Sequence, residues 1–305
     1  EGVVTGLEVN YMGAKVGKAI SQGIMEKPVI FRSHGGRAGD MENGSSHIDL
    51  AFIAAPCADP MGNCSGKYGP SACGSLGYAF SDAIHADKVI VITDYLVDYP
   101  LKDSSISEGY VDYVVCVDQI GDAEKIVSGT TKITKDPVGL RIAYLASQVV
   151  KHSGYLQDGF SFQTGAGGTS LAVASYVEDM MLKEGIKGSF CMGGITGYLV
   201  SMAEKGCFET LLDVQCFDLD AVKSIRENPR HQEISASRYA SPAAKSCAVD
   251  SLDVVILGAT QVDTDFNVSV HTDSNGYIMG GSGGHSDTAV GSKLSIVVAP
   301  LVRAR

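Results

Sequence analysis

The chain has 305 residues, a formal net charge of −11 and 45% hydrophobic residues, so it is long enough for two globular domains, each with its own core. The negative charge argues against nucleic-acid binding, which needs a basic surface. No apolar run approaches the roughly 18 residues of a membrane-spanning helix. The first residues lack the basic and apolar regions of a secretory signal, so the sequence predicts a cytoplasmic protein without a membrane segment.

Eight cysteines lie scattered along the chain, and no two of them form a C-x-x-C pair. Several fall within apolar stretches, which is typical of reduced, buried thiols in a cytosolic protein. The spacing of Cys57, Cys64 and Cys73 fits no common zinc pattern. We therefore expect reduced cysteines and no metal site.

The first predicted elements are a helix, a short strand and a glycine turn. Residues 13–25 predict the helix, because apolar residues recur every fourth position and a proline follows. The strand over 29–31 leads into Ser33-His34-Gly35-Gly36-Arg37, where glycines flanked by histidine and arginine at a strand end suit an anion. A plain surface turn is the alternative interpretation. Residues 38–47 predict a polar loop.

The next strand, residues 48–55, is followed by a polar turn over 59–63. We expect a helix over 81–86, and strands over 88–93 and 112–117 that complete the first set of strands.

A longer helix is predicted over residues 137–152, because Asp136 can cap it, Pro137 suits its first position and Gly154 can end it. Three apolar side chains are expected to face inward: Ile142, Leu145 and Val149. We place the boundary between two domains after this helix.

The second half opens with a strand over 160–164, the glycine loop Gly165-Ala166-Gly167-Gly168 and a helix over 169–183. This order presents free backbone N–H groups at a helix N-terminus, which stabilise a phosphate or a developing oxyanion. A structural tight turn is the alternative, because the motif is weak on its own. The loop lacks the lysine and hydroxyl residue of a Walker loop and the spacing of a Rossmann loop.

Strands over 189–192 and 212–217 and helices over 197–205 and 218–227 are expected next. Residues 230–245 are rich in basic side chains. They form either a solvated surface loop or a segment that holds substrate carboxylates.

A continuous apolar stretch, residues 254–257, is typical of a strand buried on both faces of a parallel sheet. Polar residues follow at 259–267, and a second glycine loop follows at 280–284. In open α/β sheets the ligand site lies beyond the carboxyl ends of the strands. We therefore expect the site here, with the second glycine loop facing residues 259–267.

The stretch around this strand repeats a stretch of the first half. Three pairs coincide at a shift of about 204 positions: Asp49 with Asp253, Asp59 with Asp263 and Asn63 with Asn267. Ser81-Asp82 also matches Ser286-Asp287, and a weaker similarity joins residues 11–13 to residues 191–193. The order of the matches predicts two related α/β domains in tandem, residues 1–152 and 153–305.

Five motifs in combination carry a resemblance to a known family: Ser33-His34-Gly35-Gly36-Arg37, Cys73-Gly74-Ser75-Leu76-Gly77-Tyr78, Gln163 to Ser170, Leu212-Asp213-Val214-Gln215 and Gly283-Gly284-His285-Ser286-Asp287. Through them essentially the whole chain resembles the citrate lyase α subunits. The resemblance implies an α/β fold of two tandem CoA-transferase-like domains, with mostly parallel sheets and flanking helices. Because that family is longer at both ends, it also implies that an N-terminal part of the first domain and a C-terminal part of the second lie outside this chain.

The resemblance implies an acyl-transfer reaction in which acetyl-carrier protein and citrate give citryl-carrier protein and acetate. The thiol belongs to a CoA-like prosthetic group on a small γ subunit, the acyl carrier protein, and free acetyl-CoA is a substitute donor. A β subunit, the citryl lyase, then cleaves the citryl thioester. We expect an oligomeric assembly and no cofactor bound tightly in this chain.

The resemblance and the strand-end pattern together predict the site. The predicted catalytic residues are Gln261, Gly167 and Gly168. The predicted substrate-binding residues are His34, Gly35, Gly36, Arg37, Gly165, Asp263, Asn267, Gly280, Gly281, Gly283, Gly284 and His285. The two glycine loops are expected to donate backbone hydrogen bonds to the oxyanion, while the histidines and the arginine neutralise the carboxylates of citrate.

Related CoA-transferases that form an acyl-enzyme have a glutamate at the position of Gln261. A carboxamide cannot attack a thioester as a carboxylate does, so Gln261 favours direct attack by citrate within a ternary complex.

Other functions can be built on a similar fold. A sugar-phosphate isomerase would need an acid/base carboxylate or a lysine at the strand ends, where this chain has Gln261. A ligand-sensing regulator would need an attached DNA-binding domain, and neither its basic composition nor its helices are present. Another CoA-transferase or an acyl-CoA hydrolase of the same fold is the nearer alternative.

Overall fold

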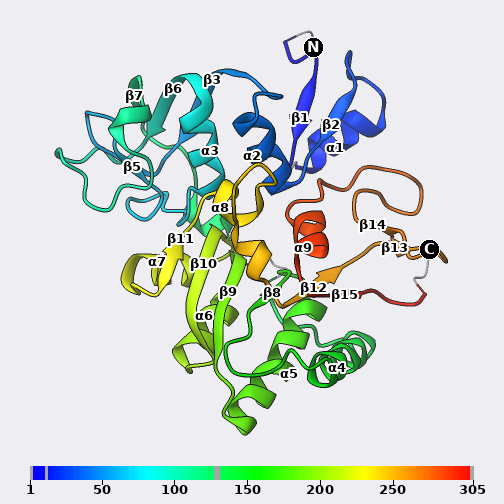
Figure 1. The fold of residues 1–305 in the computed structure, drawn as a ribbon. Coiled ribbons are helices and arrows are strands. Elements are labelled where there is room, and N and C mark those ends of the chain that lie inside the picture. Colours follow the sequence, from blue (N-terminus) through cyan, green and yellow to red (C-terminus); the bar gives the residue numbers. More distant parts are fainter. Residues whose placement is uncertain (1–2, 11–12, 127–130, 303–305) are drawn as a thin grey trace.

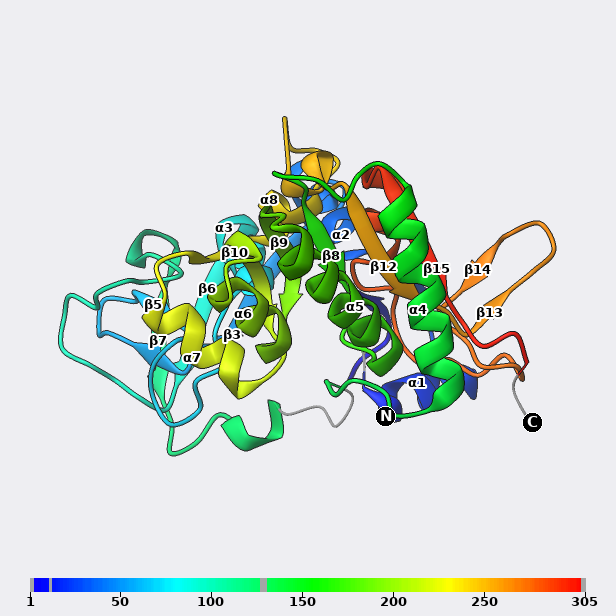
Figure 2. The same cartoon turned by 90° about the horizontal axis from the view of Figure 1, so that it is seen from below.

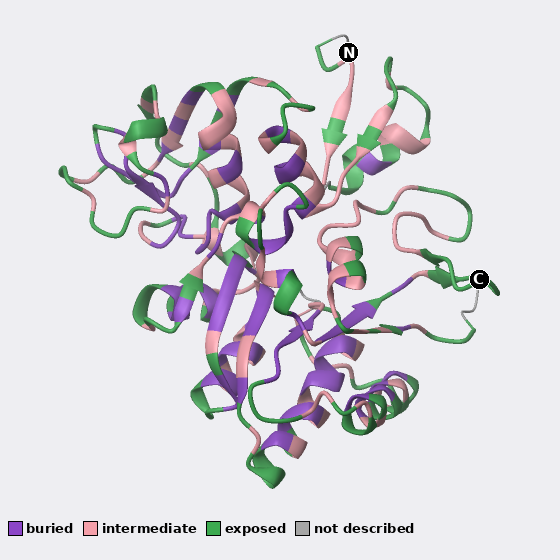
Figure 3. Ribbon diagram, viewed as in Figure 1, coloured by how far each residue is buried: buried purple, intermediate pink, exposed green. Residues whose placement is uncertain are grey.

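The computed structural model describes residues 3–10, 13–126 and 131–302 (Figure 1). Its largest sheet has six parallel strands in the order β11-β10-β9-β8-β12-β15. The strands are β8 (Phe162–Thr164), β9 (Gly188–Ile195), β10 (Phe208–Cys216), β11 (His231–Glu233), β12 (Val254–Gly258) and β15 (Leu294–Val298). Figure 3 shows the central strands of this sheet largely buried. The prediction of an α/β fold with mostly parallel sheets is confirmed.

The order in which the strands are added to this sheet reverses between β8 and β12. From β8 the strands β9, β10 and β11 follow one another toward one edge, whereas β12 and β15 lie on the other side of β8. Such a reversal is a topological switch point, where the connections after two neighbouring strands diverge and open a crevice at the carboxyl ends. The fold thus places a natural ligand site beyond Thr164 and Gly258.

Helices cover both faces of the six-stranded sheet. On one face, α4 (Pro137–His152) and α5 (Gly168–Glu184) pack on each other, and α6 (Gly197–Glu204) and α7 (Leu219–Glu227) lie beside them. On the other face lie α8 (Ala236–Ala240), the 3-10 helix Ala248–Ser251 and α9 (His285–Gly291). None of the helices in the described ranges is long and apolar enough to cross a membrane.

The caps of these helices agree with the sequence, but of the predicted inward side chains of α4 only Ile142 packs against the core. Asp136 accepts a 2.7 Å hydrogen bond from the N–H of Gly139 and begins the helix as expected. The buried residues of α4 are Ala143, Ala146, Ser147 and Val150 with Gly139 near the start, whereas Leu145 and Val149 are half exposed. Small side chains let α4 approach α5 closely, so the larger residues lie to the outside.

The first half contains a smaller parallel sheet, β3-β6-β7, and a separate parallel pair, β1-β2. The strands are β1 (Leu7–Val9), β2 (Val29–Phe31), β3 (Ile48–Ala54), β6 (Ala86–Thr93) and β7 (Tyr113–Cys116). Three helices accompany them: α1 (Ala14–Ser21), α2 (His34–Glu42) and α3 (Gly77–His85). Two short 3-10 helices span Glu108–Tyr110 and Ala123–Ile126.

The expected glycine turn after β2 is instead the first turn of α2. The expected polar loop over 38–47 is wrong for residues 38–42, which belong to this helix, and confirmed for residues 43–47. Ser33 caps the helix, because its hydroxyl accepts a 2.9 Å hydrogen bond from the N–H of Gly36. The glycines of α2 serve close packing against α8. A Cβ atom at Gly35 would lie 1.9 Å from the carbonyl oxygen of Ala240, and one at Gly39 would lie 2.9 Å from Pro242.

A β-hairpin recurs in the two halves at the predicted spacing. The first is β4 (Cys57–Ala58) with β5 (Cys64–Ser65), and the second is β13 (Gln261–Val262) with β14 (Val268–Ser269). Each begins its turn with an aspartate whose carboxylate accepts from an asparagine side chain, at 2.9 Å for Asp59 and 2.8 Å for Asp263. Gly62 and Phe266, which have positive φ angles, occupy matching positions in the two turns.

The repeat extends upstream of the hairpins. The order β1-α1-β2-α2-β3 of the first half matches β10-α7-β11-α8-β12 of the second, and β1-β2 and β10-β11 are both parallel pairs. The weak match of residues 11–13 with 191–193 involves residues 11 and 12, which lie outside the described residues. Superposition of the two halves and their boundary at residue 152 stay predictions. However, α4, which precedes that boundary, packs in the core of the six-stranded sheet.

The two hairpins differ in their surroundings. Asp59 is fully buried, and it also accepts a 2.9 Å hydrogen bond from the N–H of Leu101 in the segment that follows β6. The segment 105–106 bonds to β5 as well, through Cys64. By contrast, β13 and β14 project from the body of the molecule (Figure 2), and Phe266 at their tip is 84% exposed.

The β3-β6-β7 sheet also has one uncovered apolar face. Phe52 on β3 is 65% exposed, whereas Ile256 at the matching position of β12 is fully buried in the core formed with α4 and α5. Within the described ranges of the first half, α3 packs on β3 and β6, and no second helix covers the face that carries Phe52. Parallel sheets are normally covered on both faces, so this face is an exception within the molecule.

The matched positions give a direct test of the packing. We expect Ile256→Ala to lower the free energy of unfolding by about 2–5 kcal/mol, because it leaves a cavity in a closed core. Phe52→Ala should change it by about 0.5 kcal/mol or less, since most of that ring is already in water. Urea unfolding followed by circular dichroism measures both variants. Equal losses would contradict the assignment of the covered and uncovered sheet faces.

Candidate functional site

The two predicted glycine loops meet at the carboxyl end of β12. The N–H of Gly165 donates a 3.0 Å hydrogen bond to the carbonyl of Ile256. A ring nitrogen of His285, at the start of α9, lies 2.7 Å from the carbonyl oxygen of Gly258, to which it donates. Both loops are therefore fixed at the switch point between β8 and β12, where the fold opens its crevice.

The first loop begins α5. Gly167 is the N-cap residue and has no side chain to satisfy the free N–H groups of the first turn. A Cβ atom at Gly168 would lie 2.8 Å from the carbonyl oxygen of Lys132, so packing alone explains that glycine. At Gly167 a Cβ atom would meet nothing within 4 Å. Packing does not require a glycine there, whereas close approach of a ligand to the helix N-terminus would.

The second loop, residues 280–284, lies against α2 and α8. The carbonyl of Gly283 accepts a 3.0 Å hydrogen bond from the N–H of His34. Gly283 itself has a φ angle of 57°, which favours glycine. A Cβ atom at Gly284 would lie 2.3 Å from the hydroxyl oxygen of Tyr239, so only glycine fits. The structure thus brings the predicted 280–284 loop and the predicted His34 motif together.

Asp287 joins the same two elements. Its carboxylate accepts a 2.9 Å hydrogen bond from the N–H of Gly35 and another from the hydroxyl of Ser33. Burial raises the pKa of Asp287, while these donors lower it. The first turn of α2 is therefore capped by a residue 252 positions later in the chain.

His34 is a neutral imidazole at this junction. Its Nδ1 atom lies 3.1 Å from the amide nitrogen of Asn10, which can only donate, so Nε2 carries the proton. Its ring lies 4.3 Å from the ring of Tyr78, centroid to centroid. Burial lowers the pKa of His34 to about 4 and also lowers the pKa of His285. Both histidines therefore act as hydrogen-bonding groups and not as cations near pH 7.

The remaining predicted residues do not join this cluster. Arg37 forms a two-point ion pair with Asp82 of α3, one contact of which measures 3.1 Å. Its charge is therefore largely compensated within the first half. Gln261 pairs with Ser269 at the base of the projecting hairpin, and it is exposed.

Asp263 and Asn267 stabilise the turn of that hairpin. Hydrogen bonds from the Asn267 side chain and backbone lower the pKa of Asp263. Because the same bonds occur between Asp59 and Asn63 far from the glycine loops, they account for both residues without a ligand.

Sequence reasoning placed neither Tyr239 nor Asp287 in the site, although both lie at this junction. Tyr239 of α8 is 2% exposed, and its hydroxyl oxygen lies 3.0 Å from the side-chain nitrogen of Gln163 in β8, which donates to it. The basic stretch 230–245 therefore contains a buried helix, and a fully solvated loop is wrong. The apolar residues Ala236, Tyr239 and Ala240, at helical spacing, are the signal that indicates this burial.

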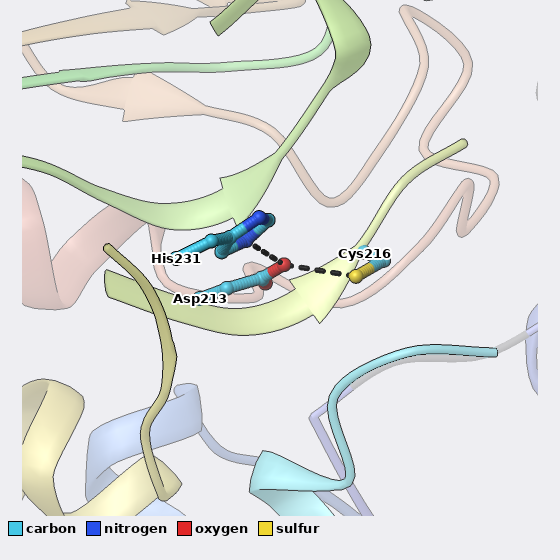
Figure 4. Close-up of side chains that lie close together, drawn as sticks. All are labelled: Asp213, Cys216 and His231. Atoms are coloured by element: carbon cyan, nitrogen blue, oxygen red, sulfur yellow. Dashed lines mark hydrogen bonds and ion pairs between the residues drawn. The ribbon is translucent and has the colours of Figure 1, made fainter. Parts of the chain in front are cut away.

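A second buried polar cluster lies between β10 and β11 (Figure 4). An Nε2–Oδ2 contact of 2.9 Å joins His231 to Asp213, and the Cys216 thiol donates to the same oxygen at 2.9 Å. Burial raises the pKa of Cys216 well above its usual value, so the thiol stays protonated. Hydrogen bonds account for the contacts that join the three side chains.

One cavity lies away from the glycine loops. It measures about 700 Å³ and is lined by β11, α8 and the loop 103–105 of the first half, with Lys67, Glu233 and Arg238 on its wall. Lys67 pairs with Asp103 at 3.0 Å, which leaves the wall mixed in charge. This cavity is a separate feature at the far edge of the sheet.

Comparison with known proteins gives consistent matches over the chain. A family model described as citrate lyase, alpha subunit, matches residues 1–305. The citrate lyase alpha chain of Klebsiella pneumoniae is 50% identical over 304 residues, which cover all of this chain and 60% of that protein. The chain thus spans about three fifths of the length of the curated relatives it matches.

The similar solved structures include the following two. A Streptococcus mutans crystal structure, described as the alpha subunit of citrate lyase in complex with citrate, is 50% identical with a TM-score of 0.96 over 99% of this chain and 60% of that one. A 4-hydroxybutyrate CoA-transferase from Porphyromonas gingivalis has a TM-score of 0.52 at 14% identity, over 86% of this chain and 64% of that one, and shows likeness of fold alone.

The low pKa of His34 predicts a pH dependence of stability. The unfolded chain binds a proton at His34 near the ordinary pKa of 6.5, whereas the folded protein binds it only near about 4. The contribution to stability is therefore complete above pH 6.5 and is lost as the pH falls toward 4, by up to about 3 kcal/mol. Between pH 7 and pH 4 the wild type should lose more unfolding free energy than His34→Asn, as measured by urea unfolding. Parallel losses in the two proteins would refute the neutral, buried imidazole.

Proposed function

The chain belongs to the citrate lyase alpha-subunit family, and on that premise we propose that its site transfers an acyl thioester to citrate. Acetyl-carrier protein and citrate would give citryl-carrier protein and acetate, with free acetyl-CoA as a substitute donor. The observation that carries the proposal is the 50% identity over the whole chain to a protein whose crystal contains citrate. The convergence of two glycine loops at a switch point supports it independently.

The reaction requires stabilisation of negative charge more than proton transfer. Exchange between a carboxylate and a thioester is nearly thermoneutral, so the barrier comes from the charged tetrahedral and anhydride-like species. Backbone donors aimed at such an oxyanion contribute roughly 3–4 kcal/mol each. The free N–H groups at the start of α5, beside the open position at Gly167, suit this role.

The geometry favours a hydrogen-bonding role for His34. His34 directs its Nε2 side toward Gly283, and a Cβ atom on that glycine would lie 3.1 Å from Nε2. We assign His34 to hydrogen bonding with a citrate carboxylate or the oxyanion, because its imidazole is neutral near pH 7. Arg37 would contribute charge to citrate binding only by exchanging its ion pair with Asp82.

Direct attack by citrate is the mechanism we propose. Gln261 cannot form a glutamyl thioester, because a carboxamide is not a comparable nucleophile. Two other carboxylates, Asp263 and Glu42, both accept hydrogen bonds. Asp263 accepts from Asn267 at 2.8 Å, and Glu42 accepts from the hydroxyl of Ser241 at 2.5 Å. Citrate and the acyl donor would therefore both be bound before either product leaves.

The wider setting is also a proposal. The acyl donor would be a CoA-like group on a γ subunit, and a β subunit would cleave the citryl thioester to complete the lyase reaction. We propose that the protein assembles with these subunits, as an oligomer, in the cytoplasm. We propose no cofactor or metal bound tightly within this chain.

Incubation with acetyl-CoA and citrate tests the proposal. We expect acetate and citryl-CoA in equal amounts, measured by chromatography, with intersecting lines in a two-substrate kinetic analysis. Without citrate, labelled CoA should not exchange into acetyl-CoA, because no acyl-enzyme forms. Acetate without citryl-CoA would identify a hydrolase, and exchange without citrate would identify a covalent intermediate.

Gly167→Val tests the position of the site in the same assay, and Gly121→Val is its control. The φ angle of −68° at Gly167 and the open space around it allow a side chain, so the fold should remain intact. The side chain would block the approach to the α5 N-terminus and should lower kcat by about 10²–10³-fold. Gly121→Val, which also adds a side chain into open space but on a distant exposed loop, should retain activity. Equal activity of the two variants would exclude this loop.

A further inference from the structure

We propose that Asp287 is a positioning residue, whose carboxylate couples α9 to α2 and thereby holds the 280–284 loop at the site. This inference rests on the proposed function, because it assigns the loop a place in acyl transfer. Asp287 was not among the residues that sequence reasoning placed in the site. Its chemistry is structural, since its two oxygens already accept from Ser33 and Gly35.

The donors at the N-terminus of α2 are satisfied by Asp287, by Ser33 and by Gly283. The N–H of Gly35 donates to Asp287, that of Gly36 donates to the Ser33 hydroxyl, and that of His34 donates to the carbonyl of Gly283. The hydroxyl proton of Ser33 is in turn donated to Asp287. All these donors are thus satisfied by the N-cap or by the α9 region, so helix and loop form one unit.

The charge of Asp287 has no basic partner among the described ion pairs. Burial raises its pKa, and the hydrogen bonds at the N-terminus of α2 oppose that effect. A buried carboxylate at a helix N-terminus is stabilised by the helix dipole and by direct N–H and O–H donors. Loss of its charge would therefore release α2 and the loop from each other.

The position of the loop depends on this link. Gly284 immediately precedes α9 and packs on the Tyr239 hydroxyl, while Gly283 bonds to His34. A displacement of α9 relative to α2 would move both glycines and the Nε2 side of His34 together. Shifts of about 1 Å in such groups lower rates by about a hundredfold, even far from the reacting atoms.

The internal repeat supplies a matched control. Asp82 of α3 is the sequence counterpart of Asp287, and it also bonds to α2, through Arg37. That ion pair lies within the first half and does not involve the 280–284 loop. Asp82→Asn and Asp287→Asn therefore remove one carboxylate contact each from the same helix, and only the second detaches the loop.

We expect both variants to fold and to lose a few degrees of thermal stability. Asp287→Asn should lower kcat for acetyl transfer to citrate by about 10–100-fold with the KM for acetyl-CoA changed less than threefold, because the loop acts in the transition state. Asp82→Asn should keep kcat within about twofold. A kcat for Asp287→Asn within twofold of that for Asp82→Asn would overturn the proposal.

Hydrogen exchange provides a readout that does not need activity. Amide exchange across residues 280–284 and at Gly35 should become at least tenfold faster in Asp287→Asn and stay unchanged in Asp82→Asn. Unchanged exchange in Asp287→Asn would overturn the positioning role. An inactive wild type with this exchange pattern would instead refute the proposed function and leave the coupling established. If Asp287→Asn does not fold, Ser33→Ala replaces it, because this variant removes one of the two hydrogen bonds to the Asp287 carboxylate. It should show the same changes in exchange and kcat in weaker form. Wild-type exchange and kcat in Ser33→Ala would overturn the proposal.

Discussion

The structure depends on a carboxylate at the N-terminus of a helix that belongs to the other half of the chain. Asp287 from α9 accepts hydrogen bonds at the first turn of α2, and the neighbouring Gly283 accepts from His34. These contacts, together with the glycine-mediated approach of α2 to α8 and the packing of α3 on β10, join two halves whose sheets do not pair with each other. They also hold His34 beside the 280–284 loop, so the arrangement of the site follows from the junction between the two halves.

The internal repeat shows how one local pattern acquires different roles. The turn at Asp59 and the turn at Asp263 have the same hydrogen bonds, because an aspartate and an asparagine four residues later satisfy the same backbone groups. In the first half the following segment covers the hairpin. In the second half the hairpin itself projects beside the switch point, and it carries Gln261. Local chemistry sets the turn, whereas the surrounding chain sets its exposure.

The sequence predicted the features that depend on short-range chemistry. The parallel strands, the cap at Asp136, the glycine loop before α5 and the paired turns follow from periodicity, capping and turn residues within a few positions. It did not predict that α2 begins at His34, that Arg37 pairs with Asp82, or that Tyr239 is buried. The ion pair of Arg37 joins residues 45 positions apart, which no local pattern encodes. The other two features do have local signals, which are the cap at Ser33 and the helical spacing of the apolar residues of α8.

In the proposed reaction, citrate binds between two backbone-donor loops and neutral imidazoles, and no acyl-enzyme forms. The most direct test is a crystal structure of this protein with citrate and CoA. The account predicts citrate beyond the carboxyl end of β12, within hydrogen-bonding distance of the 165–168 and 280–284 loops and of His34. Citrate in the cavity lined by Lys67 and Arg238, with the glycine loops unoccupied, would contradict it.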